Sequence, residues 1–302
     1  MQDDERYDDA SIVREFRERC KTERRRGKAS APREGAARIR KFRSVIYGYY
    51  RKHRRDFPWR RTDDPYHILV SEIMLQQTQV ARVAEKFVEF IDAFPTVEAL
   101  AAAPLSRVLA VWQGMGYNRR ARFLHELAGA VVKDHGGRIP DDPEALAMLP
   151  GIGRATAASI CAFAFNRPVV FIETNIRAVF IHFFFHENRT VSDRDILPLA
   201  EAALDRKEPH HWYSALMDYG AMLKRRHPNP SRKSAHHQKQ KPFEGSRRQL
   251  RGQVLRALLA HPGVTVKRLS VIIGRPEEAV SAAVGDLVRE RMVTVKGRAL
   301  YL

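Results

Sequence analysis

Two glutamates and a glycine turn have the residue types and the order expected of a site that acts on a phosphate-containing substrate. The segment 149–154 reads Leu-Pro-Gly-Ile-Gly-Arg, an apolar run follows it to position 165, and Glu173 comes shortly afterwards. A second glutamate, Glu72, lies upstream among apolar residues. A helix, a tight turn and a second helix followed by an acidic residue can grip a phosphate backbone and hold a carboxylate beside it.

The glycine turn favours anion binding for local reasons. Pro150 cannot continue the preceding helix, and Gly151 and Gly153 permit a tight reversal of the chain. The next helix then begins near Arg154 with backbone N–H groups that lack partners within the helix, and such an N-terminus attracts anions. The alternative is a plain helix–turn–helix corner that only packs core helices. The net charge of the chain and the flanking Arg154 favour phosphate binding.

Glu72 is expected inside a helix over residues 67–76. The apolar face of this helix consists of Ile68, Leu69, Ile73 and Leu75. A carboxyl group in apolar surroundings has a raised pKa and can hold a proton near neutral pH. A surface glutamate at a bend of the helix is the alternative, and the spacing alone does not separate the two.

A second glycine turn, Gly114–Tyr117, precedes a helix expected over residues 121–135. Arg119 and Arg120 follow this turn directly. We expect them to contact a phosphate or a groove of nucleic acid; the alternative is an ordinary loop between helices.

The charge of the chain points to a polyanion as its partner. Among 302 residues, 53 are Lys or Arg and 35 are Asp or Glu, which gives a net charge of +18. A chain this basic usually binds nucleic acid. Cys20 and Cys161 are the only cysteines, which excludes a disulfide framework. With no apolar span and no apolar signal segment at the N-terminus, we expect a cytoplasmic, nucleoid-associated protein.

The elements that must position these residues are almost all helices, so the predicted fold class is all-α. Residues 1–36 read as a charged tail with one helix expected over 10–26. The body of the chain, residues 37–223, shows helical spacing of apolar residues in ten segments. They are 39–53, 67–76, 80–94, 96–103, 105–113, 121–135, 155–165, 176–186, 193–204 and 212–223.

Two further segments complete the chain. Residues 224–243 read as a basic linker, whose histidines lack the cysteines or the spacing of a metal site. Residues 244–302 predict a small winged helix-turn-helix-like domain with helices over 248–261, 266–273 and 276–291 and a hairpin of 292–295 with 300–302. Such domains bind DNA or proteins, and the sequence does not choose between them.

Three motifs together resemble the A/G-specific adenine DNA glycosylases, the MutY family of the helix-hairpin-helix DNA glycosylases. They are Ser71–Val80, Gly114–Tyr117 and Leu149–Arg154, and the resemblance runs from about residue 57 to residue 223 in the family's order. It implies two helical lobes, one of residues 65–179 and one of 39–53 with 181–223, and a cleft for a flipped-out base. It also implies a monomer that binds double-stranded DNA with a mismatch or lesion.

The resemblance assigns roles to single residues. Glu72 matches the catalytic glutamate, which protonates the adenine as the glycosidic bond breaks. Glu173 matches an aspartate whose charge stabilises the oxocarbenium-like sugar, and Asn175 matches an asparagine that helps to hold this site. Gln77 matches the residue that is wedged into the duplex.

The remaining matches are contacts to DNA. Thr78, Met115 and Tyr117 match residues around the base opposite the excised one, while Gly151, Gly153 and Arg154 belong to the hairpin that holds a phosphate. Lys224 begins the basic segment, which we expect to bind DNA through its charge.

The sequence departs from the family pattern at four places. Glu173 replaces aspartate, and the extra methylene displaces the carboxylate unless the backbone compensates. Ala155 stands where bifunctional relatives carry lysine, so a Schiff base cannot form and hydrolysis without strand cleavage is expected. The four cysteines of the family's iron–sulfur loop are replaced, so no cofactor is expected; these positions are Lys224, Ser231, Ser234 and Gln240. The C-terminal segment is smaller than the family's Nudix-like domain, which reads 8-oxoguanine.

The sequence therefore predicts a monofunctional DNA N-glycosylase that releases adenine paired with 8-oxoguanine or guanine. A thymine or uracil mismatch glycosylase is the alternative among enzymes, because related scaffolds change the excised base through details of the pocket. A non-catalytic protein that binds lesions or mismatches is the alternative outside enzymes, if Glu173 has disabled the site.

Overall fold

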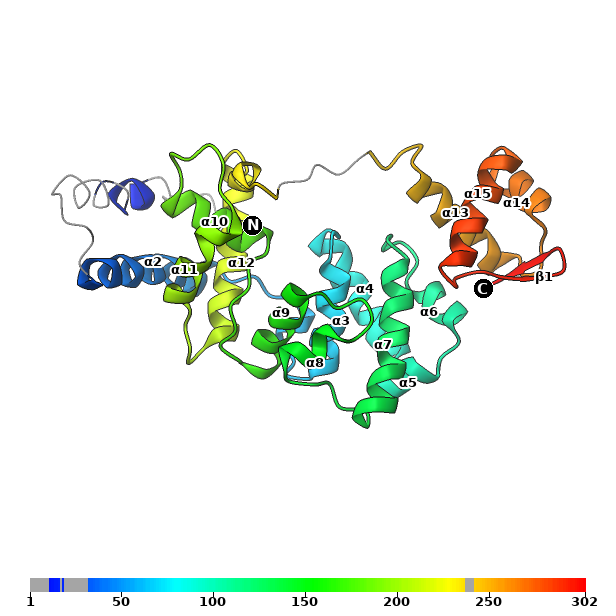
Figure 1. Cartoon of the computed structure of the whole chain (residues 1–302), viewed down its shortest axis with the longest axis horizontal. Coiled ribbons are helices and arrows are strands. Elements are labelled where there is room, and N and C mark those ends of the chain that lie inside the picture. Colours follow the sequence, from blue (N-terminus) through cyan, green and yellow to red (C-terminus); the bar gives the residue numbers. More distant parts are fainter. Residues whose placement is uncertain (1–10, 17, 19–31, 237–241) are drawn as a thin grey trace. The chain divides into compact units, whose positions relative to one another are not determined.

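The computed structural model describes residues 11–16, 18, 32–236 and 242–302 (Figure 1). Its described part is mostly helical, and its only paired strands are a two-stranded hairpin. The all-α prediction is therefore confirmed. Of the helix expected over 10–26, residues 11–16 and 18 are helical and the rest lies outside the described residues. None of the described helices is long and apolar enough to cross a membrane.

The chain divides into two compact units. The first comprises Met1–Asp56 and Ala158–Lys239, and the second comprises Phe57–Ala157 and Gln240–Leu302. We expected the boundary between two lobes near residue 180, and this was wrong. Ile176 and Val179 are fully buried in the core of the first unit. The residues before them, from Ala158 onwards, belong to the same unit. The boundary instead falls inside one helix, Arg154–Phe165.

Four helices and a short 3-10 turn build most of the first unit. They are α2 (Pro32–His53), α10 (Thr174–Phe184), α11 (Asp193–Ala203), α12 (Pro209–Arg226) and η3 (Pro230–Lys233). Helix α10 buries seven of its eleven residues and packs against α11, α12 and η3. The ring of Phe42 on α2 has its centroid 5.1 to 5.9 Å from four aromatic rings of α10 and α12. An aromatic core thus holds α10, and α10 carries Glu173 at its start.

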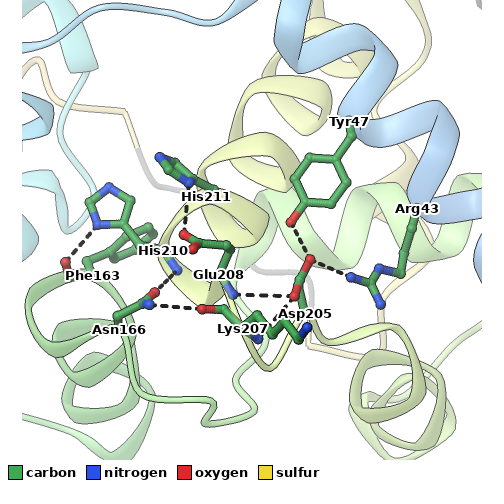
Figure 2. Close-up of polar contacts among 9 residues, drawn as sticks. All are labelled: Arg43, Tyr47, Phe163, Asn166, Asp205, Lys207, Glu208, His210 and His211. Carbon is green, nitrogen blue, oxygen red and sulfur yellow. Dashed lines mark hydrogen bonds and ion pairs between the residues drawn. The ribbon is translucent and has the colours of Figure 1, made fainter.

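The start of α12 is fixed by a polar network around Asp205 (Figure 2). The Asp205 carboxylate accepts hydrogen bonds from Arg43 and Tyr47 of α2, the latter at 2.9 Å. It also accepts from the backbone N–H groups of Lys207 and Glu208 just before α12. Asn166, after the end of α9, donates to the Lys207 carbonyl oxygen at 3.1 Å. Burial and the nearby Asp205 carboxylate raise the pKa of Tyr47.

The second unit begins with a bundle of short helices. They are η2 (Pro58–Arg60), α3 (Pro65–Leu75), α4 (Val80–Ala93), α5 (Val97–Ala102), α6 (Leu105–Val111), α7 (Arg119–His135), α8 (Pro143–Ala147) and the first turn of α9 (Arg154–Phe165). Asp64 caps α3 by accepting from the Tyr66 N–H at 2.8 Å, and Pro65 occupies the first turn, where its missing N–H costs nothing. Helix α3 buries seven of its eleven residues, so the helix that carries Glu72 lies within the core.

The C-terminal residues fold as expected, into three helices and a hairpin. These are α13 (Arg247–Ala260), α14 (Val266–Ile273), α15 (Glu277–Arg289), β1 (Thr294–Lys296) and β2 (Ala299–Tyr301). Ser246 and Thr265 cap α13 and α14 with their hydroxyl groups, and Gly274 ends α14 in the left-handed conformation. The strands pair antiparallel with Val295 opposite Leu300.

Two segments are more ordered than the sequence indicated. Helix α2 starts at Pro32, inside the segment expected to be a tail. The expected linker begins with the last turn of α12 and continues into η3, where Ser231 and Ser234 are buried. Residues 224–236 therefore belong to the folded first unit.

Helices α10 and α12 approach each other most closely at Gly220. A Cβ atom at this position would lie 2.6 Å from the Asn175 carbonyl oxygen. We predict that Gly220→Ala lowers the free energy of unfolding by about 1–3 kcal/mol, because backbone must move to admit the methyl group. The measurement is urea unfolding followed by circular dichroism.

Gly48 is the matched control, since it also lies in a helix of the first unit and a Cβ there meets nothing within 4 Å. Gly48→Ala is expected to raise the free energy of unfolding by up to about 1 kcal/mol, because alanine is the better helix former. Equal changes in the free energy of unfolding for the two substitutions would contradict the close approach of α10 and α12 at Gly220.

Candidate functional site

The side chain of Arg120 holds the C-terminal end of α3. Its Nη1 atom donates to the carbonyl oxygens of Ile73 (2.9 Å), Met74 (2.8 Å) and Gln76 (2.7 Å). The last carbonyl groups of a helix have no partners within the helix, and the helix dipole places partial negative charge there. The buried Arg120 cation therefore stabilises the C-terminal end of α3, the helix that carries Glu72.

The same guanidinium also holds the second glycine turn. Its Nη2 atom donates to the Thr78 hydroxyl (2.9 Å) and to the carbonyl oxygens of Met115 (3.3 Å) and Gly116 (3.2 Å). The guanidinium carbon lies 5.3 Å from the centroid of the Trp112 ring, a cation–π distance. Arg120 thus joins the two turns that carry the predicted contacts to the opposite base.

The prediction that Arg120 contacts DNA was wrong. Only 8% of Arg120 is exposed, and its two terminal nitrogens donate to six oxygens of the protein. Burial lowers the pKa of the Arg120 guanidinium to about 10, so it remains charged at neutral pH. Arg119, in contrast, is exposed and forms an ion pair with Glu290 at 2.5 Å.

Two residues near Arg120 have left-handed backbone conformations. Gln77, the predicted wedge, has a φ of 56° and is exposed, and Tyr117 has a φ of 48°. Such angles are uncommon outside glycine and store of order 1–3 kcal/mol when the surroundings enforce them. The hydrogen bonds of Arg120 to the residues next to Gln77 and Tyr117 hold the backbone in these conformations.

Five of the predicted DNA contacts line one groove of the second unit, with a volume of about 1330 Å³. They are Gln77, Thr78, Met115, Tyr117 and Gly151. The opposite wall is helix α13 of the C-terminal residues. The sequence predicted this helix but not its place in the groove, although its four arginines were a visible signal.

The glycine hairpin has the geometry that its sequence predicted. It connects α8 to α9 through a turn in which Gly151 has a φ of 79°, and a Cβ atom there would lie 2.7 Å from that of Phe123. Gly153, Arg154 and Ala155 are exposed at the start of α9. The positive end of α9 is thus open to an anion, whereas Gly153 and Arg154 do not line the groove.

Glu173 is the N-cap of α10. Its Oε1 atom accepts hydrogen bonds from the backbone N–H groups of Asn175 (2.5 Å) and Ile176 (2.9 Å). Glutamate is not a preferred N-cap, so its longer side chain must fold back to reach these groups. The Asn175 amide nitrogen lies 3.6 Å from the Met217 sulfur on α12. The first unit thus holds Glu173 and Asn175 side by side, while Glu72 is half-buried on α3 in the second unit.

Lys224 lies near Glu173 on the last turns of α12, within the first unit. Burial lowers the pKa of the Lys224 ammonium group, the charge of Glu173 opposes that shift, and the positive charges of Arg177 and Arg55 add to it. Arg177 itself is fixed by a bidentate ion pair with Asp193, at 2.7 and 2.8 Å. Lys224 is half-buried in this charged cluster, which sequence reasoning did not indicate.

The residues at the family's cluster positions do not fit an iron–sulfur cluster. Ser231 donates its hydroxyl to the Asn229 side chain at 2.6 Å, and the Ser234 hydroxyl accepts from the His236 N–H at 3.1 Å. Lys224 bears an ammonium group, and Gln240 lies outside the described residues. Cluster ligation needs thiolates.

Main-chain bonds hold the segment that contains these serines. The Val191 N–H donates to the Lys233 carbonyl oxygen, and the Ala235 N–H donates to that of Val191, both at 2.9 Å. The Lys233 ammonium group also donates to the His186 carbonyl oxygen at 2.5 Å.

Comparison with known proteins gives consistent matches. Residues 70–197 match the family model described as HhH-GPD superfamily base excision DNA repair protein. The adenine DNA glycosylase of Mycobacterium tuberculosis is 42% identical over 135 residues, which cover 44% of this chain and 44% of that protein. The chain thus spans about half the length of that relative.

Two further matches cover most of the other protein. The thymine/uracil-DNA glycosylase of Methanothermobacter thermautotrophicus is 32% identical over 185 residues, which cover 60% of this chain and 84% of that protein. The structure of a thermostable thymine-DNA glycosylase aligns with a TM-score of 0.58 at 30% identity, covering 65% of this chain and 91% of that one. The helical glycosylase fold implied by the resemblance is confirmed, although its two units divide at another position than expected.

The geometry of Arg120 yields a prediction for stability. Lysine keeps the charge but offers one nitrogen in place of the planar fork, so several of the six oxygens lose their donor. Each buried acceptor left unpaired costs about 1–3 kcal/mol. We expect Arg120→Lys to lower the free energy of unfolding by about 2–5 kcal/mol in urea titrations.

Arg82→Lys is the control, because Arg82 is exposed on α4 of the same unit. A change below about 1 kcal/mol is expected there. If Arg120→Lys were equally mild, Arg120 would not hold the two turns together.

Proposed function

Because the chain belongs to the HhH-GPD superfamily of base excision DNA repair proteins, we propose that it releases adenine mispaired with 8-oxoguanine or guanine in DNA. The similarity to adenine DNA glycosylases is the observation that carries this proposal. The matched residues 70–197 include Glu72, Glu173 and Asn175. The substrate is double-stranded DNA, which the protein binds as a monomer at the nucleoid.

In the proposed reaction Glu72 acts first as an acid. Its carboxyl group donates a proton to adenine N7, and the bonding pair of C1′–N9 leaves with the base. A water molecule then adds to C1′ and returns a proton to the Glu72 carboxylate. The products are free adenine and an abasic deoxyribose. A positioned general acid contributes roughly 10²–10⁴-fold to such a rate.

Glu173 stabilises the positive charge that develops on the sugar ring as the C1′–N9 bond breaks. Its Oε1 atom is held by two backbone N–H groups, which fixes the carboxylate relative to α10. This capping supports the view that glutamate replaces the aspartate of related enzymes. Lys224, whose ammonium group interacts with Glu173, orients this carboxylate and adds positive charge for a nearby phosphate.

The other proposed roles concern DNA. Gln77 enters the space of the extruded base, and Thr78, Met115 and Tyr117 surround the opposite base. The exposed start of α9 binds a backbone phosphate. Because Ala155 has no amine, the reaction stops at hydrolysis and the strand is not cut.

One alternative has an observation in its favour. The thymine/uracil-DNA glycosylase matches over most of its own length, and the aligned structure is a thymine-DNA glycosylase. Release of thymine or uracil from mismatches with guanine is therefore the second candidate function. The same scaffold and the same carboxylates can serve it, since the pocket selects the base.

The first prediction on activity separates these candidates. Labelled duplexes with A:8-oxoG, A:G, T:G and U:G are incubated with the protein, and abasic sites are revealed by alkali. We expect cleavage of the two adenine duplexes. Glu72→Gln should keep binding but lose activity by at least about 10²-fold, because an amide cannot donate the proton.

The other outcomes are equally informative. Product from T:G and U:G alone would replace adenine by the pyrimidines as the excised base. Tight binding without product from any duplex would identify a lesion-binding protein. An active Glu72→Gln variant would remove Glu72 from the acid role.

A second prediction concerns Glu173. Glu173→Gln keeps the shape and a capping oxygen but removes the charge, so the single-turnover rate should fall by about 10²–10³-fold. Glu173→Asp keeps both the charge and the cap and should stay within about tenfold of the parent. Equal rates for Glu173→Gln and the parent would show that this charge is not used.

A further inference from the structure

The C-terminal domain, residues 247–302, distributes its charge in an unusual way for a helix-turn-helix fold. Its first helix, α13, contains four arginines and no carboxylate. Its third helix, α15, contains three carboxylates and one arginine. In helix-turn-helix proteins the helix after the turn normally enters the major groove of DNA, a polyanion. The negative charge of α15 would repel the phosphates of DNA, whereas the positive charge of α13 would attract them.

Helix α13 also lies where DNA is expected. It packs against α6 within the second unit and forms a wall of the groove that contains Gln77, Thr78 and Tyr117. The groove is lined by seven arginines and only two carboxylates, a formal excess of five positive charges. The arginines are Arg82, Arg119, Arg120, Arg247, Arg248, Arg251 and Arg256.

Arg248 connects α13 directly to the proposed site. Its Nη1 atom donates to the Tyr117 hydroxyl at 2.6 Å. The guanidinium carbon lies 5.0 Å from the centroid of the Tyr117 ring and 5.4 Å from that of Phe243. Arg248 thus ties α13 to the turn that carries Tyr117, and its guanidinium lies on two aromatic faces at the groove.

The two carboxylates of the groove are engaged by arginines. Glu290 accepts from both terminal nitrogens of Arg251 and pairs with Arg119 of the helical bundle. Asp286 pairs with Arg247 and Arg289. Asp286 on α15 therefore holds Arg247 of α13, and Glu290, directly after α15, links α13 to the bundle. The groove still has an excess of arginines over carboxylates.

We propose that α13 is a second DNA-binding helix, which holds the strand opposite the excised base against residues 76–79 and 114–118. Helix α15 does not enter a groove of DNA and acts as the support of α13. The inference rests on the proposed glycosylase function only for the identity of that strand. The binding of duplex DNA by α13 follows from the charge and the groove alone.

The test compares binding by three variants of the 302-residue chain. Arg247→Ala/Arg248→Ala removes two arginines from α13, and Arg256→Ala removes one exposed groove arginine. Lys267→Ala/Arg268→Ala removes two exposed cations of α14 that do not line the groove. The probe is a fluorescein-labelled, fully matched duplex of about two helical turns. Anisotropy gives the dissociation constant at several salt concentrations between about 50 and 200 mM.

Each lost phosphate contact lowers the slope of log K against log salt by about one. We expect the slope to fall by about one to two in the α13 double variant, because the Asp286 carboxylate already offsets part of the charge of Arg247, and by about one in Arg256→Ala. The affinity of the double variant is expected to fall about tenfold or more. The α14 double variant should retain the parent slope. Arg256→Ala is needed because Arg248 also holds Tyr117, so the double variant alone could act by loosening the domain.

Two results would overturn the inference. One is a parent-like slope for both α13 variants; the other is a loss of slope in the α14 variant alone, which would assign DNA to the helix-turn-helix face. Because the matched duplex contains no base to excise, the measurement does not depend on catalysis. A protein that releases no base but shows the predicted slopes would refute the glycosylase proposal, whereas the inference that α13 binds DNA would still hold.

Discussion

The organisation of the groove depends on one buried cation. The Arg120 guanidinium donates hydrogen bonds to oxygens at the end of α3 and in the second glycine turn, in place of water. Its removal would leave six buried acceptors without this donor. It therefore couples the Glu72 helix to Gln77 and Tyr117, which both have strained backbone angles. We propose that Gln77 separates stacked bases, and this role would gain from the rigidity, because folding has already paid the entropy of ordering its backbone.

The sequence predicted most helices to within a few residues, since their apolar spacing and their caps are local. It also predicted the tight turn at Gly151, because only glycine combines that φ with the nearby Phe123 side chain. It failed for Arg120: an arginine after a glycine turn reads as a surface cation, and its partners near position 74 lie over forty residues away. The neighbours of Lys224 were hidden for the same reason. Tertiary contacts of this kind leave no periodic signal in the chain.

The segment after α12 shows how a loop can be ordered without a cluster. Its composition predicted a basic linker, yet Val191 pairs with residues on both sides of Ser234 through two main-chain hydrogen bonds. The two serines are buried and bonded within the segment itself. Each such bond contributes only about 1 kcal/mol, far less than a covalently ligated metal centre. The order of this segment therefore depends on the α10 core beneath it, against which η3 packs.

A winged helix-turn-helix outline does not by itself say which of its helices meets DNA, because fold and site are separate properties. In this domain the deciding quantity is charge. Three carboxylates on α15 would oppose a phosphate backbone, whereas in the groove two carboxylates near α13 neutralise arginines of both the domain and the bundle. These ion pairs orient α13 so that its remaining arginines share a groove with Tyr117. Asp286 thus adds to the negative charge that disqualifies α15 as a recognition helix and, together with Glu290, holds α13 in the DNA-facing position.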